Sequence, residues 1–380
     1  MEQQEIYLDN AATTRTHPEV AEAALEMMTR YYGNPSSLHK KGLEAQLLLD
    51  NARAQVAAAL GCNKDELIFT SGGTEANNLA VFGAVQAKKR RGKTIVAMSF
   101  EHSSVMEPLR YLREQGFTVK TVPPLPNGTV DAAALLDAVD EDTILLCCML
   151  VNSEVGTVAP VAEIARQARR KAPGVLIHCD AVQAFGKIPF TAAKLGVDLL
   201  TVSAHKLHAP KGCGALYIKK GVRVVPLFYG GSQEKSLRPG TENTPLGYAF
   251  GLAAQRAADT LTNTLKNAEA LREYFVNKAA ETPGICINSP KEAAPYICNI
   301  SVPGYRSEIL LHYLAEKGIF VSSGSACSKG APSHVLTAMG LAPARVDSAL
   351  RVSFCAQNTV QEIDSFFIAL GSAMRELARR

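Results

Sequence analysis

Two of the chain's apolar runs end in side chains whose chemistry fits one ligand. The run at 199–202 stops at Ser203 and is followed by His205 and Lys206, so an ε-amine lies beside a hydroxyl and an imidazole. A lysine amine can bond covalently to an aldehyde, and hydroxyl and imidazole donors favour a phosphate. The other run ends in Asp180, and a carboxylate buried at a strand end needs a cationic partner such as a protonated ring nitrogen. These residues indicate a site for a phosphorylated aldehyde.

A third apolar run, at 67–69, leads into a turn of small residues. Gly73 and Thr74 lie at the expected start of the helix that follows this turn. Backbone amides at a helix N-terminus and a threonine hydroxyl are suitable phosphate ligands. We therefore predict that this turn contributes to the same phosphate site as Ser203 and His205.

Eight short motifs, in order along nearly the whole chain, resemble those of the cysteine desulfurases, which are pyridoxal-phosphate enzymes of the class V aminotransferase group. The motifs lie at residues 7–14, 33–37, 71–75, 101–102, 180–183, 203–206, 238–243 and 322–327. The resemblance implies pyridoxal 5′-phosphate as the cofactor, L-cysteine as the substrate and a homodimer as the active form. It also implies that sulfur passes to an acceptor protein, either an iron–sulfur cluster scaffold or a tRNA-thiolation enzyme.

The resemblance assigns a role to each residue around the cofactor. Lys206 is expected to bind the cofactor and act as general base, with His102 stacked on the ring and relaying protons. Asp180 would pair with the ring nitrogen, and Gln183 would hydrogen-bond the phenolic oxygen of the ring. The phosphate is expected to be held by Gly73, Thr74, Ser203, His205 and, from the partner subunit, Thr241.

The resemblance also assigns the residues that handle the substrate. Arg351 is expected to clamp the α-carboxylate, because a guanidinium presents two parallel donors. Asn34, Asn152 and Ser153 are expected beside it, although Ser153 stands where relatives commonly have a second asparagine. Cys327 lies among small polar residues, and it is the expected nucleophile that takes the substrate sulfur as a persulfide.

Two other functions fit part of this pattern. Selenocysteine lysis or transamination would use the same cofactor site, but a transaminase has no use for a loop thiol. A weakly active cofactor-binding scaffold would be consistent with Ser153 and with the short loop between Cys327 and Ser333. The presence of Lys206 and Arg351 together with the loop thiol favours the desulfurase.

From residue 67 to about 220 the chain alternates apolar runs with amphipathic helical segments, a pattern typical of a mainly parallel sheet between helices. Ligands bind at the carboxyl ends of such strands, where the predicted site residues fall. A long helix, with Thr244 as its N-cap, is expected to lead into the C-terminal part. We predict an α/β fold with a large cofactor-binding domain at 16–250 and a smaller α+β domain formed by 1–15 and 251–380. The resemblance adds that the large sheet has seven strands.

Composition excludes several classes of protein. The 380 residues are 47% hydrophobic, and 40 basic residues nearly balance 36 acidic ones, which argues against a nucleic-acid partner. No apolar run approaches the length of about 20 residues needed to span a membrane. The nine cysteines include no CxxC pair, so neither a zinc site nor a disulfide framework is predicted. We expect a soluble cytoplasmic enzyme that binds no metal.

Overall fold

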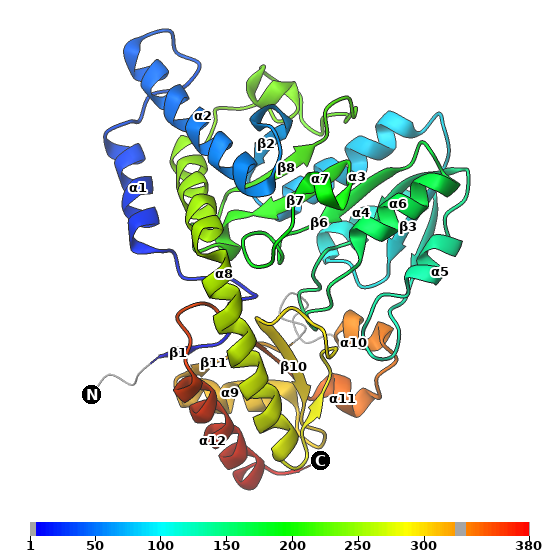
Figure 1. Cartoon of the computed structure of the whole chain (residues 1–380), viewed down its shortest axis with the longest axis vertical. Helices are drawn as coiled ribbons and strands as arrows, with labels where there is room; N and C mark the ends of the chain where they lie inside the picture. The colour runs from blue at the N-terminus through cyan, green and yellow to red at the C-terminus, as the bar shows by residue number, and fades with distance from the viewer. Residues whose placement is uncertain (1–4, 324–331, 380) are drawn as a thin grey trace.

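A seven-stranded sheet forms the centre of the larger part of the molecule (Figure 1). The computed structural model describes residues 5–323 and 332–379. In order across the sheet, the strands are β2 (Leu67–Thr70), β8 (Gly214–Ile218), β7 (Leu199–Ser203), β6 (Leu176–Asp180), β5 (Thr143–Cys147), β3 (Thr94–Met98) and β4 (Thr118–Val122). The strands from β7 to β4 are parallel, whereas β8 is antiparallel to both neighbours. The predicted α/β fold with a mainly parallel sheet is confirmed.

Helices cover both faces of this sheet. Every residue of β3, β5, β6 and β7 is buried, as expected for strands that are apolar on both sides. On one face, α3 (Gly73–Lys88) and α4 (Ser103–Glu114) form an apolar cluster with the strands. On the other face, α5 (Ala132–Asp137), α6 (Val161–Lys171) and α7 (Ala192–Leu195) belong to a second cluster. The carboxyl ends of the parallel strands are therefore held rigidly at one edge.

The longest helix, α8 (Thr244–Glu281), joins the two parts of the molecule (Figure 1). Its first half packs against α1 (Pro18–Thr29) and α2 (Lys40–Leu60), and its second half enters the smaller part. The predicted cap was wrong by one residue. Asn243, not Thr244, caps α8, because the side chain of Asn243 accepts a hydrogen bond from a backbone amide of the first turn. In the described part of the chain, no helix has the length and apolar character to cross a membrane.

A three-stranded antiparallel sheet organises the smaller part. Its strands lie in the order β12 (Ala349–Ser353), β10 (Ile297–Ser301) and β9 (Cys286–Ile287). Two helices, α9 (Ser307–Glu316) and α12 (Val360–Glu376), pack with this sheet and with α8 around a third apolar cluster. This α+β arrangement agrees with the prediction.

The N-terminal segment packs with the smaller part (Figure 1). Strand β1 (Ile6–Tyr7) pairs in parallel with β11 (Ile319–Phe320). Two short helices, α10 (His334–Ala338) and α11 (Pro343–Asp347), precede β12. The described residues also form the short 3-10 helices η1 (Lys64–Glu66), η2 (Ala204–Lys206) and η3 (Gln233–Ser236). A capping box formed by Thr359 and Glu362 begins α12. The domain limits given above stay a prediction.

Candidate active site

A cavity of about 530 Å³ lies at the carboxyl ends of the parallel strands and is lined by residues of both parts of the molecule. The structure brings ten of the predicted site residues to its wall. They are Gly73, Thr74, His102, Ser153, Asp180, Gln183, Ser203, His205, Lys206 and Arg351. Most of them follow strand ends or begin helices, so the geometry of a parallel sheet accounts for their convergence.

Asp180, the last residue of β6, is held in place by two hydrogen bonds. The side-chain amide of Asn77 donates to Oδ2 at 2.7 Å, and the backbone amide of Val182 donates to Oδ1 at 2.9 Å. These donors fix the carboxylate at the cavity wall, where it can pair with a cation. Sequence analysis missed Asn77, although its place on α3, one helical turn after Thr74, was a usable signal.

Lys206 ends the 3-10 turn that follows β7. Its Nζ donates to the carbonyl oxygens of Ala11 and Ala12, both at 2.6 Å. The same loop is fastened by Thr14, whose hydroxyl and amide donate to the carbonyl of His205 at 2.9 and 3.0 Å. The N-terminal motif therefore has a structural reason, because it fixes the position of the lysine amine.

The start of α3 and the end of β7 form a small polar recess. A Cβ added to Gly73 would lie 3.0 Å from a methyl group of Val182 and 3.6 Å from Cβ of Ser203, so a larger residue would crowd this approach. Among the residues that the structure describes, the buried hydroxyl of Ser203 has no hydrogen-bond partner. His205 Nδ1 lies 3.1 Å from the hydroxyl of Thr13, and burial lowers the pKa of His205 to about 4. The recess therefore offers helix amides, a hydroxyl and a neutral imidazole to an anion.

His102 caps α4 and faces the cavity. Its Nδ1 accepts a hydrogen bond from the amide of Ser104 at 3.1 Å and lies 2.7 Å from the hydroxyl of the same residue. Burial lowers the pKa of His102, which favours the neutral ring. Because Nδ1 accepts the backbone hydrogen bond, the proton of the neutral ring is assigned to Nε2.

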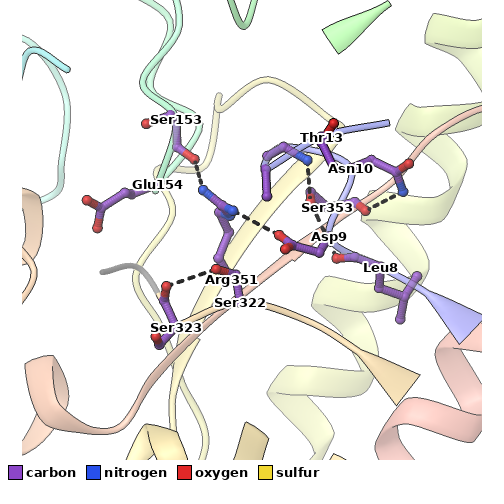
Figure 2. A network of polar contacts seen from close by, with 12 residues as sticks. Leu8, Asp9, Asn10, Thr13, Ser153, Glu154, Ser322, Ser323, Arg351 and Ser353 are labelled. Atoms are coloured by element: carbon purple, nitrogen blue, oxygen red, sulfur yellow. Dashed lines mark hydrogen bonds and ion pairs between the residues drawn. The ribbon is translucent and has the colours of Figure 1, made fainter. Parts of the chain in front are cut away.

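Arg351, on β12, is buried and holds a fixed orientation (Figure 2). Its Nη2 donates to Asp9 Oδ1 at 2.8 Å, and its Nη1 donates to the carbonyl of Ser153 at 3.0 Å. Within the described part of the chain, Nε of Arg351 is buried without a hydrogen-bond partner. Burial raises the pKa of Asp9, and the adjacent guanidinium partly offsets that rise. The arginine thus keeps its Nε donor available for a further acceptor such as a carboxylate.

Two buried glutamates on the cavity wall were given no role from sequence. Glu101 accepts a hydrogen bond from the amide of Met149 at 2.6 Å, and complete burial raises its pKa well above the usual range. Burial also raises the pKa of Glu154, to about 7. Glu101 lies in the motif at 101–102 and Glu154 follows Ser153, but the sequence alone does not show that these carboxyl groups are buried.

Three predicted residues do not line this cavity. Asn34 is exposed in the turn after α1, where its side-chain oxygen accepts from the amide of Ser36. Thr241 is exposed in the loop before α8. Asn152 is buried behind the wall, where its amide nitrogen donates to the carbonyl of Phe100. Their assigned roles stay predictions.

The predicted nucleophile Cys327 lies outside the described residues, so its role also stays a prediction. The described cysteines include Cys147, Cys148 and Cys179, all buried in or beside strands of the large sheet. Burial raises the pKa of each of these three thiols well above its usual range, so they are poor nucleophiles.

The cavity fits pyridoxal phosphate, the cofactor implied by the resemblance. The unpartnered Ser203 hydroxyl and the open approach at Gly73 suit the phosphate, and the fixed carboxylate of Asp180 suits the ring nitrogen. Lys206 can provide the covalent link, and the neutral ring of His102 can stack on the cofactor. The volume is also in the range typical of small-ligand sites.

Comparison with known proteins places the chain among pyridoxal-phosphate enzymes. The family model described as aminotransferase class-V matches residues 6–366. The cysteine desulfurase IscS of Methanosarcina thermophila is 39% identical over 366 residues, covering 96% of this chain and 90% of the relative. A solved NifS-like protein has a TM-score of 0.93 at 39% identity, covering 98% of this chain and 100% of its own. The NifS-like protein of Rickettsia africae has a TM-score of 0.89 at 31% identity, with coverages of 98% and 100%.

Proposed function

The chain belongs to the class-V aminotransferase family, and we propose that it is a cysteine desulfurase that converts L-cysteine to L-alanine with pyridoxal phosphate. The observation that carries this proposal is the presence of Lys206, Asp180 and Arg351 on the wall of one cavity. An amine, a counter-ion and a carboxylate clamp are the three groups that an amino-acid substrate bound to this cofactor requires.

When bound, the cofactor withdraws electrons from the Cα of an amino-acid substrate. Asp180 supplies the negative charge that keeps the ring nitrogen protonated. Arg351 orients the α-carboxylate with its buried Nε donor, and the amine of Lys206 removes the Cα proton as general base. The neutral His102, with its proton assigned to Nε2, can donate on the cavity side of the ring.

Cys327 is the proposed sulfur acceptor within the chain. Its thiolate bonds to the substrate sulfur while the carbon–sulfur bond breaks, and the electron pair of that bond stays with the carbon fragment. Protonation of that fragment gives alanine, and the sulfur remains as a persulfide on Cys327. The persulfide sulfur then passes to an acceptor protein, for which an iron–sulfur cluster scaffold or a tRNA-thiolation enzyme in the cytoplasm is proposed.

A second copy of the chain is proposed to complete each site. Large apolar side chains are exposed on α1 (Leu25 and Met28) and on α2 (Leu43 and Leu47). Exposed apolar surface on these helices supports association with another protein surface. Thr241, which is exposed and away from the cavity of its own chain, would reach the phosphate site of the partner. Sedimentation of the purified protein is expected to give a dimer.

The activity is tested with purified protein supplied with pyridoxal phosphate, L-cysteine and a reductant. We expect a yellow protein that releases alanine and sulfide in equal amounts, and a Cys327→Ala variant that keeps the colour and releases neither. Full turnover by Cys327→Ala would instead favour the transaminase or lyase chemistry, and a colourless protein would reject the proposal.

A further inference from the structure

The polypeptide around Ser153 and Glu154 connects the carboxylate-clamping arginine to the chain that follows the segment containing Cys327. We propose that Glu154 is a positioning residue for sulfur transfer. It acts through Ser333 to hold the C-terminal flank of that segment at a fixed position relative to Arg351. This inference rests on the proposed function and names a residue that the mechanism above does not use.

The contact between Glu154 and Ser333 has a defined direction. Ser333 is the N-cap of α10, and its Oγ accepts a hydrogen bond from the amide of Leu336 at 3.1 Å. The hydroxyl proton is therefore left for Glu154, whose Oε2 lies 2.5 Å from the same Oγ. The side chain of Glu154 is 8% exposed and Ser333 is 4% exposed, so water does not compete for this bond.

The backbone of Glu154 is itself fixed. Its amide donates to the side-chain oxygen of Asn152 at 2.9 Å, and its carbonyl accepts from the side chain of Asn299 at 3.2 Å. The preceding carbonyl, that of Ser153, accepts from Nη1 of Arg351 at 3.0 Å (Figure 2). Two consecutive residues thus contact the substrate clamp on one side and the N-cap of α10 on the other.

The N-terminal flank of the same segment is tied to the same arginine. Ser322 donates its amide to the carbonyl of Arg351 at 3.1 Å, and its carbonyl accepts from the amide of Arg351 at 2.6 Å. One flank is therefore joined to Arg351 directly, and the other is joined through Ser153, Glu154 and Ser333. Both described flanks of the segment that contains Cys327 are therefore fixed relative to the arginine proposed to hold the substrate.

A second residue, His334, also holds the start of α10. His334 Nε2 lies 3.0 Å from the carbonyl oxygen of Glu101, and His334 Nδ1 lies 3.9 Å from Glu154 Oε1. Loss of the Glu154 contact alone should therefore displace the flank without releasing α10. A displacement of about 1 Å can slow a reaction about 100-fold, so a partial shift is expected to lower the rate of sulfur transfer roughly tenfold.

The test separates sulfur transfer from the chemistry that precedes it. Glu154→Ala removes the contact alone, and Ser333→Ala removes both the contact and the N-cap of α10. Glu154→Gln keeps an amide oxygen that can accept from Ser333. Ser365→Ala serves as the matched control, because its hydroxyl makes a hydrogen bond on the exposed side of α12. Two rates are measured for each protein: alanine formation from L-cysteine, and exchange of the Cα proton of L-alanine with deuterated water. The second reaction needs the cofactor and Lys206 but no thiol.

We expect Ser333→Ala and Glu154→Ala to lower kcat for alanine formation by about tenfold, with the exchange rate within twofold of wild type. Glu154→Gln should recover most of kcat, and Ser365→Ala should match wild type. Unchanged kcat in Ser333→Ala, or an equal fall in both rates, would overturn the inference. If Glu154→Ala does not fold, Ser333→Ala and Glu154→Gln still decide the outcome. Absence of both reactions in the wild-type protein would instead reject the proposed function.

Discussion

Replacing Asp9 with asparagine should strengthen binding of the substrate carboxylate while weakening the fold. Asp9 occupies one edge of the Arg351 guanidinium at 2.8 Å, and the side chains are 18% and 6% exposed. A substrate carboxylate on the same guanidinium would be repelled by the charge of Asp9. Asparagine has nearly the same shape and can still accept from Nη2, so the variant removes the charge with little change in packing.

The size of the effect follows from the geometry of a shared guanidinium. Two like charges about 6 Å apart at an effective dielectric constant of about 20 repel by roughly 3 kcal/mol. Solvent screens the partly exposed Asp9, so about half of this value is expected, which corresponds to roughly tenfold tighter binding. Arg351 is buried, so loss of the Asp9 charge leaves the guanidinium less compensated, and we expect a cost of about 1–2 kcal/mol in stability after the same screening.

The assay measures the dissociation constant of L-alanine from the absorbance of the bound cofactor, together with the melting temperature. Asp198→Asn is the matched control, because Asp198 is 8% exposed and pairs with Arg169 at 2.6 Å away from the cavity. Both variants should melt at a lower temperature, and only Asp9→Asn should bind L-alanine more tightly. Weaker or unchanged binding in Asp9→Asn would refute the reasoning, because Asp9 would then be required to orient Arg351.

Other predictions concern groups around the cofactor site. Asn77→Ala removes the 2.7 Å hydrogen bond to Asp180, so we expect at least a tenfold loss in cofactor affinity, measured by fluorescence titration. Unchanged affinity would contradict the role of Asn77 in holding the Asp180 carboxylate. The pKa of Glu154 is raised from 4.5 to about 7, so the folded protein binds this proton more tightly than the unfolded chain does and loses stability as the pH rises through that interval. The loss of stability approaches about 3 kcal/mol above pH 7. The melting temperature of Glu154→Gln should therefore rise relative to that of wild type as the pH increases from 5 to 8. A difference in melting temperature that does not depend on pH would contradict the raised pKa of Glu154. Gly73→Val should exclude the phosphate and abolish cofactor binding, while the melting curve of the protein without cofactor stays cooperative.

Residues that follow buried strands were predictable from sequence. Lys206 and Asp180 each come after an apolar run, and such runs form strands whose carboxyl ends share one edge of the sheet. Ser203 and Gly73 were found by the same reasoning. The family resemblance added Arg351, which lies in the smaller part, and the structure brings it to the same cavity.

Contacts between distant segments could not be predicted in this way. Asp9 and Arg351 are 342 residues apart, and Glu154 and Ser333 are 179 residues apart, so no local pattern links them. The N-cap of α8 was missed for a local reason, since Asn243 stands beside Thr244 and both types cap helices well. Only the packing of the backbone decides which of two suitable side chains accepts the hydrogen bond.

The central claim is that one cavity holds the cofactor on Lys206 and delivers the substrate sulfur to Cys327. It is tested most directly by a single turnover of the purified protein with L-cysteine in the absence of a reductant, followed by mass spectrometry of its peptides. The account predicts one molecule of alanine per active site and one additional sulfur atom on the peptide that contains Cys327. Alanine formed without added sulfur at Cys327, or no alanine at all, would contradict it.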